Sequence, residues 1–93
     1  MRAIWKDQVI AESDHTIKVE GSHYFPPQSL KHEYLRDSSR QSVCPWKGTA
    51  SYFDVAVGAE VNPAAAWYYP APKAAAADIR GYVAFRHGVI VQP

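Results

Sequence analysis

The alternation of apolar and polar residues is the feature that most constrains the fold of this chain. In residues 16–20, Ile17 and Val19 share one face of an extended segment, and the polar side chains share the other. Residues 49–57 show the same period over a longer stretch and predict the longest strand. A period of two is typical of half-buried β-strands, because successive side chains point to opposite faces. The chain is therefore expected to fold mainly into β-structure.

Proline, glycine and polar clusters divide the chain into short segments, which we read as strands, turns and helical turns. The helical turns are expected near residues 27–30 and 73–78, the second because it contains four consecutive alanines. Residues 37–40 are read as a loop from their composition. Hairpin turns are expected at Asp7-Gln8 and at residues 86–88, which join the last two strands. The expected strands are 3–6, 9–12, 16–20, 23–25, 31–35, 49–57, 65–69, 81–85 and 89–91.

Charge and cysteine content argue against several classes of protein. The chain has ten Lys and Arg residues and nine Asp and Glu residues, which gives a net charge of +1, and the charged residues form no run. No basic stripe is present to neutralise phosphates, so nucleic acid is not an expected partner. No apolar run approaches the roughly 20 residues that span a bilayer, and no signal-peptide pattern is seen, so no membrane association is expected. A single cysteine forms no internal disulfide, and a cytoplasmic location is expected.

Sequence motifs for several kinds of chemistry are absent. The chain has no glycine-rich dinucleotide or phosphate loop and no Gly-x-Ser-x-Gly elbow. It has no closely spaced carboxylate pair that would hold two metal ions. The four histidines lack the spacing of a metal pair on one element and are expected on the surface; they are His15, His23, His32 and His87. No cofactor and no metal are therefore expected.

The segment Cys44-Pro45-Trp46-Lys47-Gly48 is the first candidate site. Lys47 lies three residues after the only thiol, and a nearby cation favours the thiolate form of a cysteine. Gly48 lets the backbone turn or approach a ligand closely. Cys44 is read either as a reactive or ligand-contacting thiol at a pocket mouth or as a buried structural residue. The structural interpretation is favoured over a nucleophile, because a catalytic thiol needs a base and no histidine lies close in sequence.

Aromatic residues form the second candidate site. The chain has twelve of them, three being Trp, which is many for 93 residues. Large rings fill small cores, each burying about 150–250 Å², but they also line pockets for flat rings or cations. Three buried indole N–H groups would all need partners, so we expect some of the rings to line a pocket. The rings in question are Trp5, Tyr24, Trp46, Tyr52, Trp67 and Tyr69.

Short motifs over nearly the whole chain occur in an order that a known family shares. They are Ala3-x-Trp5, Ile10-Ala11-Glu12-Ser13, Glu20-Gly21, Tyr24-Phe25-Pro26, Cys44-Pro45-Trp46-Lys47-Gly48-x-Ala50-x-Tyr52, Trp67-x-Tyr69-Pro70 and Gly81-Tyr82-Val83-Ala84-Phe85. The chain resembles a bacterial family of unknown function that carries a nominal nucleotidyltransferase label. One departure is Asp7-Gln8, where the family usually has an Asn-Gly turn.

The resemblance implies a compact, mostly β, tent- or barrel-like domain and brings no established catalytic residues. The length and the absence of an internal repeat also indicate one domain. The prediction is a single mainly β domain over residues 1–93. We expect a small antiparallel barrel- or tent-like fold with one or two short helical turns.

The function we expect is a small-molecule-binding domain with an aromatic pocket and a flat or cationic ligand. Rings supply stacking and cation–π contacts, and a few polar groups fix the orientation of the ligand. Glu12, at the end of an apolar strand, is included as a carboxylate at the pocket rim, although such residues are more often solvated strand ends. The expected ligand-binding residues are Trp5, Glu12, Tyr24, Cys44, Trp46, Lys47, Tyr52, Trp67 and Tyr69.

Two other functions stay open on the sequence. One is a small enzyme, either nucleotidyltransferase-like or using Cys44 as a thiol nucleophile. The other is a protein-interaction domain, for example a homodimer that pairs through exposed strand edges. The sequence leaves open whether the protein is an enzyme and names no catalytic residue.

Overall fold

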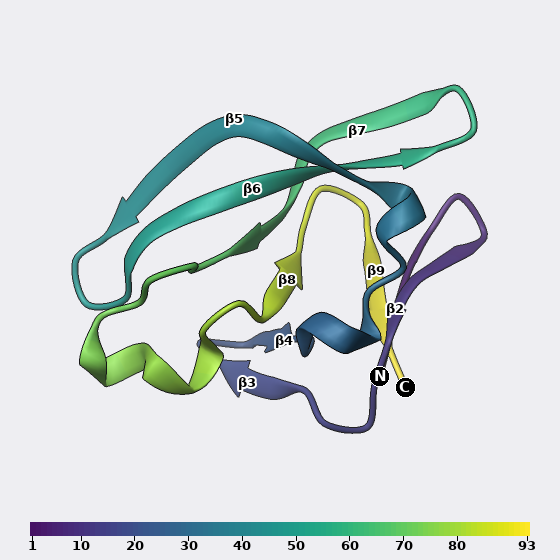
Figure 1. Ribbon diagram of the computed structural model, residues 1–93. Coiled ribbons are helices and arrows are strands. Elements are labelled where there is room, and N and C mark those ends of the chain that lie inside the picture. The colour runs from purple at the N-terminus through teal and green to yellow at the C-terminus, as the bar shows by residue number, and fades with distance from the viewer.

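The computed structural model describes all 93 residues and consists of nine short or medium strands with three 3-10 turns (Figure 1). The strands are β1 (Arg2–Trp5), β2 (Gln8–Glu12), β3 (Ile17–Val19), β4 (Ser22–Tyr24), β5 (Leu35–Cys44), β6 (Gly48–Val57), β7 (Glu60–Tyr68), β8 (Val83–Phe85) and β9 (Ile90–Gln92). The 3-10 turns are η1 (Pro27–Ser29), η2 (His32–Tyr34) and η3 (Ala74–Ile79). All strand pairs are antiparallel. The mainly β, antiparallel fold class is confirmed.

The strands form three sheets that are not closed into a barrel. The largest has the order β5-β6-β7-β8, the second has the order β2-β1-β9, and β3 pairs with β4 alone. In the largest sheet, β5, β6 and β7 run beside one another as a long curved ribbon (Figure 1). β5 and β6 pair down to Cys44 and Gly48, so residues 45–47 form their hairpin loop at one end of the ribbon.

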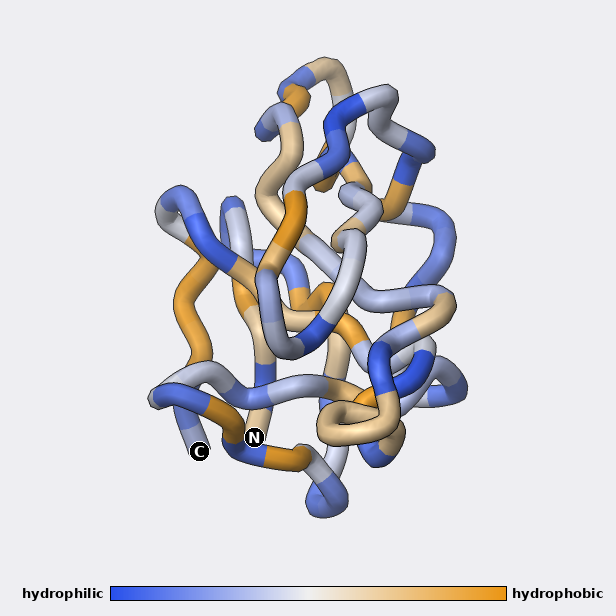
Figure 2. The backbone as a smooth tube through the Cα atoms, turned by 90° about the vertical axis from the view of Figure 1, so that its left-hand side faces the viewer, coloured by the Kyte–Doolittle hydropathy of each residue, from blue (hydrophilic) through white to orange (hydrophobic).

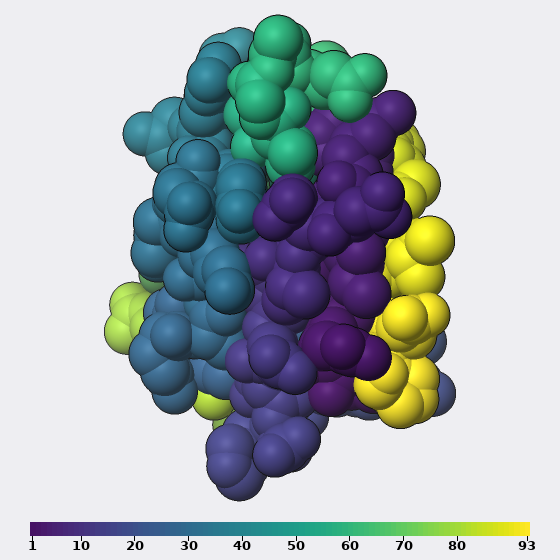
Figure 3. All heavy atoms as spheres, turned by 90° about the vertical axis from the view of Figure 1, so that its right-hand side faces the viewer, coloured from purple at the N-terminus to yellow at the C-terminus, as the bar shows by residue number.

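The second sheet brings the two ends of the chain together. Arg2 of β1 pairs with Gln92 of β9, and Figure 3 shows the first strands and the C-terminal strand side by side on one face of the molecule. On the other side of β1, β2 pairs so that Ala3 faces Ala11. The segment after η1 covers the free edge of β2, because Lys31 N–H donates to the carbonyl of Ile10 at 2.8 Å.

The β3–β4 hairpin is joined to the edge of the four-stranded sheet. Its two turn residues, Glu20 and Gly21, have φ values of 51° and 83°. Immediately after β4, Phe25 and Val83 exchange backbone hydrogen bonds of 2.7 and 2.9 Å. This pairing holds the hairpin beside β8, which places its turn near the loop between β5 and β6.

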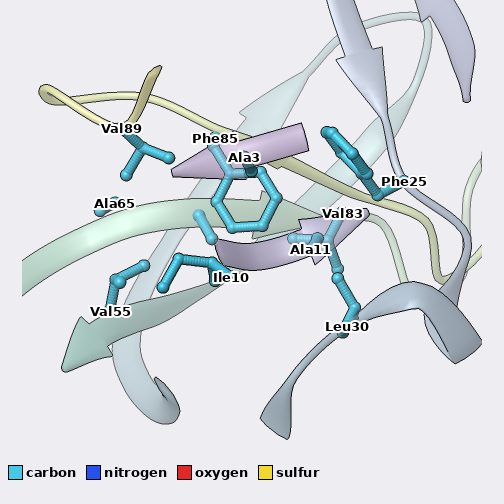
Figure 4. Close-up of a cluster of buried hydrophobic side chains, with 11 residues drawn as sticks. Ala3, Ile10, Ala11, Phe25, Leu30, Val55, Ala65, Val83, Phe85 and Val89 are labelled. Atoms are coloured by element: carbon cyan, nitrogen blue, oxygen red, sulfur yellow. The ribbon is translucent and has the colours of Figure 1, made fainter. Parts of the chain in front are cut away.

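Buried side chains gather in two groups. The main core contains residues from the two larger sheets and from the segments that follow β4, η1 and β8, and Figure 4 shows their side chains converging from different strands. Its buried members are Ala3, Ile10, Ala11, Phe25, Leu30, Val55, Ala65, Ala66, Val83, Phe85 and Val89. The second group, which we call the tyrosine cluster, comprises Tyr24, Ala50, Tyr52, Ala64, Tyr69, Ala76, Ile79 and Ala84. Short hydrophobic stretches are interspersed with hydrophilic ones along the backbone (Figure 2).

Residues 37–40, which the composition indicated as a loop, lie within β5, so that prediction is wrong. Their pairing with β6 is irregular between Asp37 and Gln41, where the register shifts. β5 is an edge strand of its sheet, and most of its side chains remain in water. A polar edge is a common way to keep such a strand from pairing with other chains, and this explains a loop-like composition in a strand.

The predicted C-terminal hairpin is also wrong. β8 pairs with β7, whereas β9 crosses to the other sheet and pairs with β1. The intervening turn does form at His87 and Gly88, which both have positive φ, but it is fastened to β7 because Arg86 N–H donates to the carbonyl of Ala65 at 2.8 Å. The chain therefore leaves one sheet at this turn and completes the free edge of β1.

Three smaller differences concern element boundaries. The first hairpin turns at Lys6 and Asp7, with φ values of 50° and 63°, one residue earlier than expected. The helical turns expected near residues 27–30 and 73–78 are confirmed as η1 and η3. The strand expected at residues 31–35 is instead η2, and β7 begins at Glu60 rather than at residue 65.

No helix in the chain is long and apolar enough to cross a membrane.

Candidate functional site

A hollow of about 390 Å³ lies between the β3–β4 hairpin, the β5–β6 hairpin and β7. The three tyrosines of the tyrosine cluster contribute to its wall and come from segments far apart in the sequence. Six of the nine binding residues predicted from the sequence line it, namely Tyr24, Cys44, Lys47, Tyr52, Trp67 and Tyr69. The fold therefore brings most of the predicted residues into one place.

The other three predicted residues do not line the hollow. Trp5 packs against the main core from β1, and the Lys6 ammonium lies 5.5 Å from its ring centroid. Glu12 is exposed at the end of β2. Trp46 stands at the rim, 42% exposed, and its indole Nε1 donates to Oε1 of Glu20 at 3.2 Å. Trp5 and Glu12 thus belong to a different part of the molecule, while Trp46 borders the site.

The segment Cys44-Pro45-Trp46-Lys47-Gly48 contains the loop of the β5–β6 hairpin, and hydrogen bonds from Lys73 hold this loop in place. The backbone N–H of Lys73 donates to the carbonyl of Lys47 at 2.8 Å, and Lys73 Nζ donates to the carbonyl of Pro45 at 2.6 Å. Gly48 follows with a φ of 114°, a conformation that side-chain-bearing residues rarely adopt. These contacts turn the loop back against residues 71–73 and direct the Lys47 side chain into the hollow.

Lys47 is the only buried charged residue of the chain, with 8% of its surface exposed. Its ammonium donates to Oε1 of Glu20 at 2.7 Å. It also lies 5.1 Å from the ring centroid of Trp46 and 5.7 Å from that of Tyr69. A carboxylate and two ring faces thus offset the loss of water around the charge.

The ion pair shifts the pKa of both partners toward the charged forms. Burial by itself lowers the pKa of Lys47, but the hydrogen bond to Glu20 and the charges of Tyr24, Tyr69 and Glu20 outweigh it, so this pKa lies above 10.5. The hydrogen bond and charge of Lys47 hold the pKa of Glu20 below 4.5, with help from Trp46. Lys47 is therefore an ammonium at neutral pH and is not available as a base.

Tyr24 and Trp67 form a perpendicular pair on one side of the hollow. Their ring centroids are 6.1 Å apart, with an interplanar angle of 86°. The indole Nε1 of Trp67 donates to the hydroxyl oxygen of Tyr24 at 3.1 Å. Edge-to-face packing and this hydrogen bond fix both rings, and they leave the Tyr24 hydroxyl proton free to donate.

Tyr52 lies between two arginines. The guanidinium carbons of Arg86 and Arg40 are 4.9 and 5.3 Å from its ring centroid, and its hydroxyl shares a 2.8 Å hydrogen bond with Ser42. Burial raises the pKa of Tyr52, but the Ser42 hydrogen bond and the two arginines outweigh it, so this pKa lies below 10.0. The arrangement places positive charge on this side of the hollow.

Tyr69 differs from Tyr52 because burial dominates its environment. Burial raises the pKa of Tyr69 above 10.0, against the opposing charge of Lys47. Its side chain is 5% exposed, and its hydroxyl makes no hydrogen bond within the chain. Since no fully buried polar side-chain atom lacks a partner, this hydroxyl keeps some exposure, and Tyr69 lines the hollow. Tyr69 thus presents an O–H donor there at neutral pH.

Cys44 is half-buried at the wall of the hollow, and none of the four histidines lines it. His23 lines a second hollow of about 290 Å³, beside the N-terminus, and its Nδ1 is 2.9 Å from the Thr16 hydroxyl. No group of three or more His, Cys, Asp or Glu side chains that could hold a metal ion is present. The thiol therefore has no imidazole base within its own pocket.

Sequence reasoning missed four residues that line the hollow: Val19, Glu20, Ser22 and Arg86. Glu20 was assigned only to the polar face of a strand, and Arg86 only to a turn. Glu20-Gly21 was nevertheless one of the shared family motifs, and a charged residue before a turn glycine was the signal that could have found it. Arg86 carries no comparable signal, because its position depends on the crossing of β9 to the second sheet.

The fold and the site define a small antiparallel β domain with a tyrosine-lined hollow around a buried lysine. The chain belongs to the family described as a domain of unknown function (DUF427), whose model, named NTP_transf_9, matches residues 1–92. The resemblance found in the sequence is thereby confirmed over nearly the whole chain. No curated protein matches the chain.

Proposed function

We propose that this chain is a small-molecule-binding domain and that the tyrosine-lined hollow is its binding site. The observation that carries the proposal is the convergence of four aromatic rings and one buried ammonium on a single hollow. Its volume of about 390 Å³ lies within the range of pockets that hold small ligands. Apolar walls with few fixed polar groups are typical of such sites.

The rings favour a flat ligand. Trp67 is held perpendicular to Tyr24, and Tyr52 is held by Ser42 and its neighbouring arginines, so these walls are rigid before any ligand arrives. Rigid aromatic walls give stacking contacts at little cost in side-chain entropy. The open hydroxyl of Tyr69 and the ammonium of Lys47 would then orient the ring by its polar substituents.

The surroundings of Cys44 and Lys47 do not support adding a reaction to this proposal. A thiol nucleophile needs a base, and the hollow contains no histidine, while Lys47 is protonated. Activity measurements would test the nucleotidyltransferase-like alternative, and size measurements would test the homodimer. Neither has a specific contact in the structure that favours it.

The three tryptophans provide an internal test of ligand binding. Compounds with flat rings, such as nucleosides, indoles and aromatic acids, would be added while the indole N–H signals are followed by NMR. We expect ligands to shift the signals of Trp67 and Trp46 and to leave that of Trp5 unchanged, because Trp5 lies on the opposite sheet. Unchanged Trp67 and Trp46 signals with every compound would contradict the proposal.

A matched pair of variants separates the pocket from general effects on the protein. Trp67→Leu removes one wall of the hollow, whereas Trp5→Leu removes a half-buried indole elsewhere. We expect the first to weaken ligand binding by roughly tenfold or more, as loss of a stacked ring does, and the second to leave it unchanged. Equal losses in the two variants would place the binding site outside the hollow.

A further inference from the structure

Cationic hydrogen-bond donors outnumber anionic acceptors among the lining residues of the hollow, and this imbalance carries information about the ligand. Only one of the three ammonium protons of Lys47 has a partner in the chain, the Glu20 carboxylate. Arg86 donates through Nε to the carbonyl of Ala64 at 2.8 Å, and its two terminal nitrogens make no hydrogen bond. No fully buried side-chain nitrogen or oxygen is without a partner, so the terminal nitrogens of Arg86 keep some exposure, and both Arg86 and Lys47 line the hollow.

The hydroxyl groups add to the same surplus. Tyr24 receives the indole N–H of Trp67 and keeps its own proton free, and the Tyr69 hydroxyl has no partner in the chain. The only carboxylate among the lining residues is that of Glu20. Two full positive charges, on Lys47 and Arg86, therefore face one negative charge.

Glu20 occupies the place where an anion would be expected. It lies in the two-residue turn of the β3–β4 hairpin with a φ of 51°, and its carboxylate is largely exposed. A single oxygen, Oε1, accepts both the Lys47 ammonium at 2.7 Å and the Trp46 indole at 3.2 Å. The carboxylate thus takes up one of the three donor protons of the buried ammonium from the rim, and no second carboxylate lines the hollow.

We propose that the ligand carries an anionic oxygen group, a carboxylate or a phosphate, which binds toward Lys47 and Arg86, and that Glu20 is an internal competitor for this anion. The inference rests on the proposed binding function and narrows it to one ligand charge. A cationic ligand would be repelled by two cations that only one carboxylate offsets. An anion would be attracted by both cations and would accept hydrogen bonds from their free N–H groups.

Phenyl compounds whose head groups differ in charge test the sign of the ligand. Benzoate and phenyl phosphate, neutral benzyl alcohol and cationic benzamidine would be titrated at constant ionic strength while the Trp67 indole signal is followed. We expect one or both anions to bind at least roughly tenfold more tightly than benzamidine, and the comparison of benzoate with phenyl phosphate identifies the preferred anion. Benzamidine or benzyl alcohol binding as tightly as both anions overturns the inference but keeps the binding function. No response to any of the four probes overturns both.

The chain contains a natural control for the residues involved. Lys6 also stacks beside a tryptophan and pairs with an exposed glutamate, Glu60, at 3.6 Å, but on the other side of the molecule. We expect Lys47→Met to abolish the preference for anions and Lys6→Met to leave it intact. Lys47→Met should still fold, because its partner Glu20 is exposed and would not become an unpaired buried charge.

The competition between Glu20 and the ligand anion can be measured separately. Glu20→Gln removes the charge that occupies the ammonium, so benzoate should bind severalfold more tightly while benzyl alcohol binding stays unchanged. Glu60→Gln makes the same change in net charge away from the hollow and should alter neither. Benzoate affinity that is unchanged in Glu20→Gln, or raised equally in Glu60→Gln, would overturn the role of Glu20.

Discussion

The main core and the tyrosine cluster are two buried regions that take neighbouring residues from the same extended segments of the chain. Tyr24 and Phe25 are neighbours in the sequence, yet Tyr24 belongs to the cluster and Phe25 to the main core. The same division occurs at Ala84 and Phe85. Because successive side chains of a strand point to opposite faces, one extended segment supplies both regions.

The two regions differ in polarity. The buried side chains of the main core contain no hydrogen-bonding group, whereas three of the eight in the tyrosine cluster carry hydroxyls. The cluster also adjoins the only buried charge, Lys47. An apolar interior gains most from close packing, while polar groups beside a hollow remain available to a ligand. The comparison suggests a division of roles, in which the main core stabilises the fold and the tyrosine cluster would serve the proposed binding function.

The largest expected effect comes from emptying the main core. Phe25 is fully buried and packs edge-to-face on Phe85 with centroids 5.6 Å apart. Phe25→Ala should lower the free energy of unfolding by about 3–5 kcal/mol, through lost burial and the cavity left behind. Denaturant unfolding would measure it, with Phe25→Leu as the milder variant if the alanine protein does not fold.

The matching change in the cluster is Tyr69→Phe, which removes a hydroxyl that has no partner in the chain. We expect it to change the free energy of unfolding by less than about 1 kcal/mol. If Tyr69→Phe lowered the free energy of unfolding as much as Phe25→Ala does, the distinction between the two regions would be wrong.

An effect smaller than that of Phe25→Ala is expected at the loop that positions Lys47. Gly48 has a φ of 114°, and an added Cβ would meet backbone atoms only at ordinary distances of 3.6–3.7 Å. The cost of Gly48→Ala is therefore backbone strain, about 1–3 kcal/mol, and the Trp46 indole signal should move as the loop adjusts. Gly58→Ala, in the exposed turn after β6 with a φ of 59°, is the control and should leave the Trp46 signal in place. An unmoved Trp46 signal in Gly48→Ala would show that this glycine does not set the loop.

The smallest expected effect is the pH dependence of the Lys47–Glu20 pair. The pKa of Glu20 is lowered, so its contribution to stability is complete above its unfolded value of 4.5 and is lost as the pH falls through the folded value. The pKa of Lys47 is raised, so its contribution is complete below 10.5 and is lost as the pH rises through the folded value. The pair should therefore stabilise the protein throughout the range between these limits.

The acid side of this pH dependence, where Glu20 becomes protonated, is the easier one to measure. The Trp46 indole donates to Glu20, so its NMR signal should titrate below pH 4.5, and this step should disappear in Glu20→Gln. The melting temperature should fall slightly more on acidification in the parent than in that variant. Glu60→Gln serves as the control for net charge, and a Trp46 titration that persists in Glu20→Gln would assign the step to another group.

Part of the candidate site could be predicted from residue types alone. Aromatic residues on separate strands, together with Lys47 in a glycine-terminated loop, indicated a pocket, and six of the nine predicted residues do line one hollow. Trp5 and Glu12 were misplaced because a local pattern does not tell which sheet a strand joins. Glu20 and Arg86 were missed because their roles arise from contacts with distant strands.

The sequence by itself determined most of the strands and their buried faces, since burying one side of an extended segment imposes a period of two on that segment alone. It also determined the two helical turns near prolines and alanines. Only the tertiary structure decided that β9 pairs with β1 instead of β8, and that the polar residues 37–40 extend β5. Strand partners and the lining of the hollow depend on which edges remain free after the whole chain has packed, and no local pattern records that outcome.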